Sequence, residues 1–257
     1  MIELSNLQWI ILMVGAGIMG LSKGGIPGAG NLTVALFALV MEDALGPRGV
    51  ALSIGLLLPV LVSGDLVSTL VYRKHVEWAH VRRLLPFFLV GVLVGWWAFD
   101  FFQSVERSSV LKMLIGGILL VITGLRLITH RVFKSNQSSN LPFFIGPFFG
   151  IVGGVATMLA NAAGPIAQFY FLAMRLPKYA FIGTSAWLFL IINLGKVPLM
   201  CELGVLNMDV FYISVWLFFP AVLGALIAPK IVRYIRQDWF ERLIWFFIVV
   251  AGLRMIF

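Results

Sequence analysis

Two short polar stretches hold the residues best able to bind an anion. Residues 22–31 (SKGGIPGAGN) and residues 160–165 (ANAAGP) each interrupt a long apolar run. The first stretch adds the ammonium group of Lys23, and the second adds the amide of Asn161. A helix that begins at such a break turns its free N–H groups and the positive end of its dipole toward the break. We therefore predict that the two breaks together form an anion-binding site.

The helix that follows each break should begin at a residue suited to that position. We expect the first of these helices to begin near Asn31, a good N-cap residue, and the second to begin at Pro165. Glycines in the breaks would let a ligand approach the backbone closely. The predicted substrate-binding residues of the two breaks are Lys23, Gly24, Gly25, Gly28, Asn31, Asn161, Ala162, Ala163 and Gly164.

Three further polar residues lie inside apolar segments, where charged and amide groups are costly and therefore usually functional. Asp65 is a candidate for coupling transport to protons, and it could instead pair with Lys23 or face a water-filled vestibule. Asn193 and Lys196 are candidate substrate-binding residues. For Lys23 and Lys196 the alternative is that the long side chain extends to the membrane interface.

The composition places these residues in a membrane protein. The chain of 257 residues is 61% hydrophobic and 12% charged, and apolar runs of about 20 residues, the length that crosses a bilayer as a helix, recur along it. We therefore predict an all-α polytopic membrane domain that spans residues 1–257 and has the lipid bilayer as its surroundings. The net charge of +8 fits basic residues that orient the chain in the membrane, and it does not indicate nucleic-acid binding. The predicted apolar segments are 7–41 (broken), 49–72, 84–102, 110–129, 141–174 (broken), 179–200, 208–229 and 239–257.

Enzymatic chemistry finds little support in the sequence. His75, His80 and His130 all lie in predicted loops, so they can form neither a metal cluster nor a Ser–His pair in the core. Asp65 has no acidic partner for general acid–base catalysis. The chain also lacks the GxxxxGK[ST] motif of nucleotide-driven proteins. We therefore expect no enzymatic activity, no metal and no cofactor.

The chain shows an internal repeat. Residues 123–128 (TGLRLI) match residues 251–256 (AGLRMI), and aligning the two breaks through their prolines places Lys23 opposite Asn161. The predicted halves are residues 1–129 and 141–257, with a polar linker at 130–140. Broken helices at corresponding positions of two halves are typical of secondary transporters.

The basic residues favour re-entrant hairpins over complete spans at the two breaks. If all eight apolar segments cross the membrane, lysine and arginine are divided almost evenly between the two sides. If both broken segments enter and leave on the same side, the other side keeps only Arg48, Arg107, Lys112 and Arg254. The positive-inside rule favours the second arrangement, and eight complete spans remain the alternative. Each half is then one hairpin plus three spans, which inverts the second half relative to the first.

Three motifs resemble those of the TauE/SafE family of bacterial membrane proteins, which is associated with export of sulfite and organosulfonates. They are residues 20–28 (GLSKGGIPG), 72–78 (YRKHVEW) and 160–165 (ANAAGP). The resemblance covers nearly the whole chain. It implies a multi-pass protein of the bacterial inner membrane whose substrate is a small sulfur-containing anion.

The sequence thus favours a secondary transporter, with an exporter as the direction that the resemblance implies. We expect small sulfur-containing oxyanions, such as sulfite or organosulfonates, to be moved by alternating access around the two breaks. A passive anion channel is the first alternative, and a receptor or assembly subunit without transport is the second. The oligomeric state stays open, a homo-oligomer included.

Overall fold

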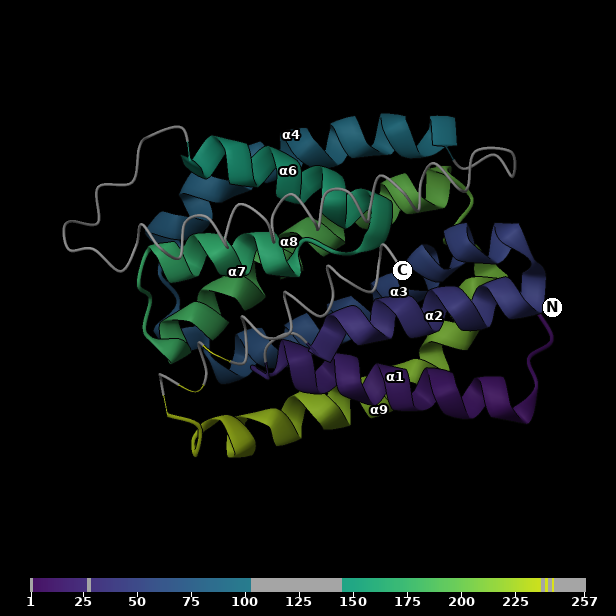
Figure 1. The fold of residues 1–257 in the computed structure, drawn as a ribbon, viewed down its shortest axis with the longest axis horizontal. Coiled ribbons are helices and arrows are strands. Elements are labelled where there is room, and N and C mark those ends of the chain that lie inside the picture. The colour runs from purple at the N-terminus through teal and green to yellow at the C-terminus, as the bar shows by residue number, and fades with distance from the viewer. Residues whose placement is uncertain (1, 27–28, 103–144, 237–238, 240–241, 243–257) are drawn as a thin grey trace.

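The chain folds into helices. A computed structural model describes residues 2–26, 29–102, 145–236, 239 and 242, and this part of the chain holds eight α-helices and one short 3₁₀ turn, with no strand (Figure 1). The α-helices are α1 (Asn6–Lys23), α2 (Ala29–Leu45), α3 (Pro47–Val71), α4 (Trp78–Phe102), α6 (Ile145–Ala160), α7 (Gly164–Ala173), α8 (Lys178–Glu202) and α9 (Met208–Val232), and the 3₁₀ turn is Arg73–His75. The predicted all-helical class is confirmed. The predicted segment 110–129, the linker 130–140 and most of segment 239–257 lie outside the described residues.

Four of these helices are long and apolar enough to cross a bilayer. They are α3, α4, α8 and α9, each of 25 residues. A helix of that length extends about 37 Å at 1.5 Å per residue, which exceeds the ~30 Å hydrocarbon core of a bilayer. The predicted unbroken spans in the described part of the chain therefore correspond to single long helices.

At each predicted break the chain ends one helix and turns back on itself. Along the first hairpin (α1 and α2), Gln8 donates to Asp43, and Thr33 donates to the carbonyl of Gly15, which shows that the two helices run antiparallel. In the second hairpin (α6 and α7), the rings of Phe149 and Phe169 stack with their centroids 5.0 Å apart. Both breaks are therefore turns between paired helices rather than kinks in a continuous helix.

The helices that follow the breaks begin close to the expected residues. Helix α2 begins at Ala29, two residues before Asn31, so Asn31 lies in the first turn and is not the N-cap. Helix α7 begins at Gly164, with Pro165 next to it. Proline lacks a backbone N–H. It fits there because the first N–H groups of a helix have no intrahelical acceptor, so no hydrogen bond is lost.

The two hairpins enter the molecule from opposite ends. Helices α3 and α8 pack antiparallel: the start of α8 at Gly183 lies beside Tyr72 at the end of α3, and Val205, after α8, lies against Gly55 near the start of α3. Each hairpin leads directly into one of these two helices. The first hairpin therefore opens toward one end of the molecule and the second toward the other, as Figure 1 shows.

The first helix of each hairpin packs on a long helix at closely approaching glycines. Helix α1 lies on α9, where a Cβ at Gly20 would overlap the carbonyl of Ala221, and α6 lies on α4, where a Cβ at Gly91 would overlap the carbonyl of Ile151. Within a membrane, close backbone contact at small residues is a main source of helix association. Gly95 also lies against α6, where a Cβ would come within 2.8 Å of Cβ of Met158.

Candidate functional site

The two hairpin turns line one cavity of about 90 Å³. The first hairpin contributes Lys23 and Gly25, and the second contributes Asn161 and Gly164. Helices α3 and α8 supply the side walls, with Asp65 on α3. Since a water molecule needs about 10–15 Å³ of such a volume, the cavity has room for several waters or one small oxyanion.

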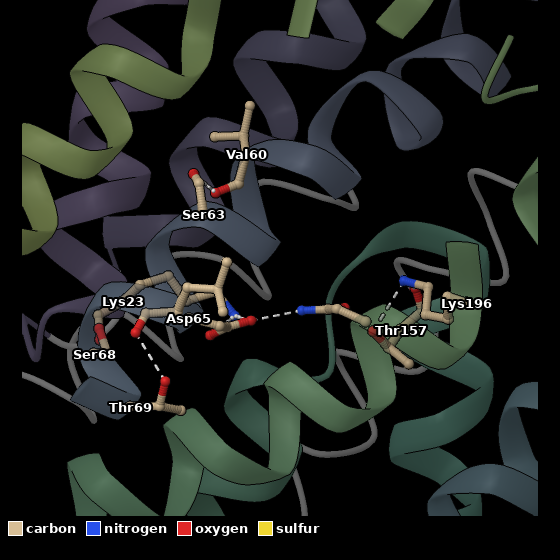
Figure 2. Close-up of polar contacts among 10 residues, drawn as sticks. Lys23, Val60, Ser63, Asp65, Ser68, Thr69, Thr157 and Lys196 are labelled. Atoms are coloured by element: carbon tan, nitrogen blue, oxygen red, sulfur yellow. Dashed lines mark hydrogen bonds and ion pairs between the residues drawn. The ribbon is translucent and has the colours of Figure 1, made fainter. Parts of the chain in front are cut away.

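A buried ion pair joins the first turn to α3. The ammonium of Lys23 lies 2.8 Å from Oδ1 and 3.0 Å from Oδ2 of Asp65, a side chain that is 1% exposed (Figure 2). The same ammonium lies 4.7 Å from the centroid of the Phe189 ring on α8, within range of a cation–π interaction. Of the sequence alternatives for Asp65, the structure shows pairing with Lys23, and the Lys23 side chain reaches the cavity instead of an interface.

Side chains of α3 also hold the end of α1 in place. The last carbonyls of a helix have no intrahelical donor. Ser68 Oγ donates to the carbonyl of Lys23 at 2.8 Å, and Tyr72 Oη donates to the carbonyl of Gly24 at 2.9 Å. A Cβ at Gly64 would lie 2.9 Å from Cβ of Lys23, so glycine at that position lets α1 approach α3. These contacts fix Lys23 at the cavity.

Asn193 connects α8 to the same carboxylate. Its Nδ2 donates to Oδ2 of Asp65 at 2.7 Å, and the Asn193 side chain is 1% exposed. Because an ionised carboxylate only accepts hydrogen bonds, the amide nitrogen must face Asp65. The Oδ1 atom of Asn193 is then left buried without a hydrogen-bond donor among the described residues. Asn193 lines the cavity, as its predicted role requires.

A second lysine, fully buried, lies at the turn of the second hairpin. Lys196 on α8 is fully buried, and its ammonium donates to Asn161 Oδ1 at 2.6 Å, to the Thr157 carbonyl at 2.7 Å and to Thr157 Oγ1 at 3.3 Å. Figure 2 shows the Lys196 side chain directed at Thr157. The alternative in which Lys196 extends to the membrane interface is therefore wrong, because the side chain is buried and bonded to Thr157 and Asn161 at the end of α6.

Asn161 owes its position to the end of α6. Its φ of 52° lies in the left-handed region, which asparagine adopts more easily than most residues. The following N–H of Ala162 then bonds back to the carbonyl of Ala156, which closes the helix end. This turn leaves the Asn161 side chain free to join the two halves, because its Nδ2 donates to the carbonyl of Ile54 on α3 at 2.9 Å.

Not every predicted site residue reaches the cavity. At Gly24 the close neighbour is α9, since a Cβ there would lie 2.5 Å from that of Ala228. Ala162 is buried but does not line the cavity, whereas Ala163 does. Gly28 lies outside the described residues, as does the side chain of Asn31. The substrate-binding role of the residues that do line the cavity stays a prediction.

Several cavity residues were not predicted from the sequence. Thr157 lies four residues before Asn161, a spacing that places both on one helix face, and this spacing could have revealed it. Gln168 on α7 and Ser185 on α8 also line the cavity, and their buried Oε1 and Oγ atoms have no hydrogen-bond partner among the described residues. Their polarity within apolar segments was the available signal. In the described part of the chain, no group of three or more His, Cys, Asp or Glu residues is placed to hold a metal ion.

Comparison with known proteins gave one match. The model of the family described as sulfite exporter TauE/SafE matches residues 11–255. Comparisons with curated proteins and with solved structures gave no match.

Proposed function

From the premise that the chain belongs to the sulfite exporter TauE/SafE family, we propose that it is a secondary transporter that exports small oxyanions such as sulfite or organosulfonates. Membership of this family makes the chain a multi-pass membrane transporter of sulfur-containing anions and not an enzyme. The observation that carries the finer proposal is that both hairpin turns line one cavity, with the ammonium of Lys23 in its wall.

The cavity offers two kinds of group that suit a sulfur oxyanion. The Lys23 ammonium supplies a full positive charge, and the first turn of α7 supplies backbone N–H groups that have no intrahelical partner. A Cβ at Gly164 would meet no atom within 4 Å, so an anion could approach the backbone there closely. Asp65 holds Lys23 in place until the anion binds, and it is our candidate for the group that couples transport to protons.

Alternating access is supported by how the two halves correspond. Helix α1 packs on α9 of the other half, and α6 packs on α4 of the first half. In each half, a residue at the hairpin turn contacts a residue of the long helix that follows: Lys23 contacts Asp65, and Asn161 contacts Lys196. These pairings fit inverted repeats within a single transport domain, in which rocking of one half against the other opens the cavity to alternate sides of the membrane.

Reconstitution into liposomes tests the proposal. We expect purified protein to accumulate sulfite or an organosulfonate against its gradient when a proton gradient is imposed, and we expect a protonophore to abolish the accumulation. Lys23→Ala should lose most of this uptake, whereas Lys23→Arg should keep part of it because the charge remains. Uptake that never exceeds equilibrium would indicate a passive channel. Full transport by Lys23→Ala would show that the assigned site is wrong.

A further inference from the structure

We propose that the cavity selects a singly charged anion over a doubly charged one, and that the buried charge of Lys196 sets this selectivity. The inference rests on the proposed function and narrows its substrate class. It makes Lys196 a specificity-determining residue that acts through Asn161 and Thr157, the two cavity residues that accept its hydrogen bonds.

The first step is that Lys196, in its ammonium form, would be a cation without an anion, and the three acceptors around its nitrogen suit that form. All the acceptors of its ammonium are uncharged: the Thr157 carbonyl, Thr157 Oγ1 and Asn161 Oδ1. No carboxylate among the described residues lies within ion-pair distance of it. Its side chain is also fully buried, so water does not screen the charge. A buried charge in that position is costly unless an opposite charge comes near it.

The second step is the sum of charges around the cavity. Lys23 and Asp65 are the ionisable residues in its described wall, and they neutralise one another at 2.8 Å. Protonated Lys196, directly behind the wall, would add one uncompensated positive charge. A singly charged anion in the cavity would bring the total to zero. A doubly charged anion would leave one buried negative charge in excess, and a neutral molecule would leave the positive charge uncompensated.

The third step concerns the polar atoms that the protein leaves unpaired. Asn193 Oδ1 and Gln168 Oε1 are buried acceptors in residues that line the cavity, and neither has a donor among the described residues. An unpaired buried acceptor is unfavourable, so a ligand that carries a hydrogen-bond donor gains by supplying it. Hydrogensulfite, a singly charged anion with a hydroxyl group or an S–H group, has both features. Fully ionised sulfite has neither.

Three ligands of similar shape and different charge test the proposal. Dimethyl sulfone is neutral, methanesulfonate carries one negative charge and sulfate carries two, and all three are tetrahedral at sulfur. Binding to the purified protein would be measured by titration calorimetry at pH 7, with gluconate as the other anion in the buffer. We expect methanesulfonate to bind at least about tenfold more tightly than either of the others, because one buried charge interaction is worth that much or more. Sulfate binding as tightly as methanesulfonate would overturn the proposal.

Substitutions of Lys196 test whether this residue sets the charge selectivity. Lys196→Met removes the charge at similar length, and it should reduce the preference for methanesulfonate over dimethyl sulfone at least about tenfold. Lys196→Arg should restore most of the preference, which a purely structural role of the lysine would not explain. Lys230→Met, at the exposed end of α9, is the matched control and should behave as wild type. An unchanged preference in a folded Lys196→Met protein would contradict the proposal.

Removing a negative charge in place of a positive one gives a second test, which is needed if Lys196→Met does not fold. Asp65→Asn leaves two positive charges at the cavity, so the binding ratio should move toward sulfate by about tenfold or more. No movement toward sulfate would overturn the charge argument. The proposed function fails on a different result, the absence of saturable uptake of every sulfur oxyanion in liposomes. Equal transport of sulfate and methanesulfonate would leave that function standing and refute the charge selectivity.

Discussion

At the scale of single residues, Asn161 links backbone geometry to the charges of the site. Its left-handed backbone conformation ends α6, and its side chain bridges Lys196 on α8 and the carbonyl of Ile54 on α3. Both the amide oxygen and the amide nitrogen therefore have partners in the protein. Asn161 thus holds the turn and the Lys196 side chain in place, which is how we expect it to contribute to anion binding.

Replacing Asn161 separates these two contributions. Asn161→Asp fits the same backbone conformation and places a carboxylate beside Lys196, so we expect the methanesulfonate affinity of the folded variant to fall at least about tenfold. Asn161→Gly also fits the backbone but leaves the ammonium short of an acceptor. It should lower the free energy of unfolding by about 1–3 kcal/mol. An Asn161→Asp protein that binds methanesulfonate as tightly as wild type would show that the Lys196 charge does not act on the ligand.

At the scale of the elements, the position of Lys23 depends on how closely α1 approaches α9. A Cβ at Gly20 would overlap the carbonyl of Ala221, whereas a Cβ at Gly17, on the same helix, would lie 3.8 Å from the carbonyl of Pro220. The first contact leaves no room for a methyl group, and the second is an ordinary van der Waals distance. Both glycines of α1 therefore face α9, but only Gly20 leaves no space for a side chain.

Alanine substitutions make this difference measurable. Gly20→Ala should push α1 away from α9 and lower the free energy of unfolding by about 1–3 kcal/mol, as overpacking does. Because α1 ends at Lys23, transport should fall as well. Gly17→Ala should leave stability within about 0.5 kcal/mol of wild type. Thermal unfolding in detergent would compare the two variants. Equal shifts in both would show that the close contact at Gly20 does not limit the packing.

At the scale of the whole molecule, the antiparallel arrangement of α3 and α8 fixes which loops lie at the same end. The start of α4 and the turn between α7 and α8 lie together, because Gly183 contacts Tyr72. The turn after α8 lies at the other end, beside Gly55. The basic residues in the sequence predict the same division, with the end that holds the start of α4 in the cytoplasm.

Topology reporters test this division in the membrane. A reporter inserted after His80 and another after Arg175 should both give a cytoplasmic signal, and one near Asn207 should give an external signal. Reporter activity and accessibility to an impermeant thiol reagent would measure the side independently. A cytoplasmic signal at Asn207 would contradict re-entrant hairpins and favour eight complete spans.

Much of the fold was predictable because it follows from local properties of the sequence. Breaks such as residues 22–31 stop a helix wherever they occur, since glycine and proline disfavour helical backbone in any surroundings. Runs of about 20 apolar residues specify spanning helices for the same local reason. Within the described residues, the predicted spans and the two interruptions therefore agree with the structure.

The sequence by itself determined the class of protein, the two breaks and the presence of Lys23, Asp65, Asn193 and Lys196 inside apolar segments. Only the tertiary structure decided their partners. Asp65 pairs with Lys23 and receives a hydrogen bond from Asn193, and Lys196 turns inward to Asn161. The physical reason is that the partner of a buried charge depends on which helix faces meet, and residues far apart in the chain set that contact.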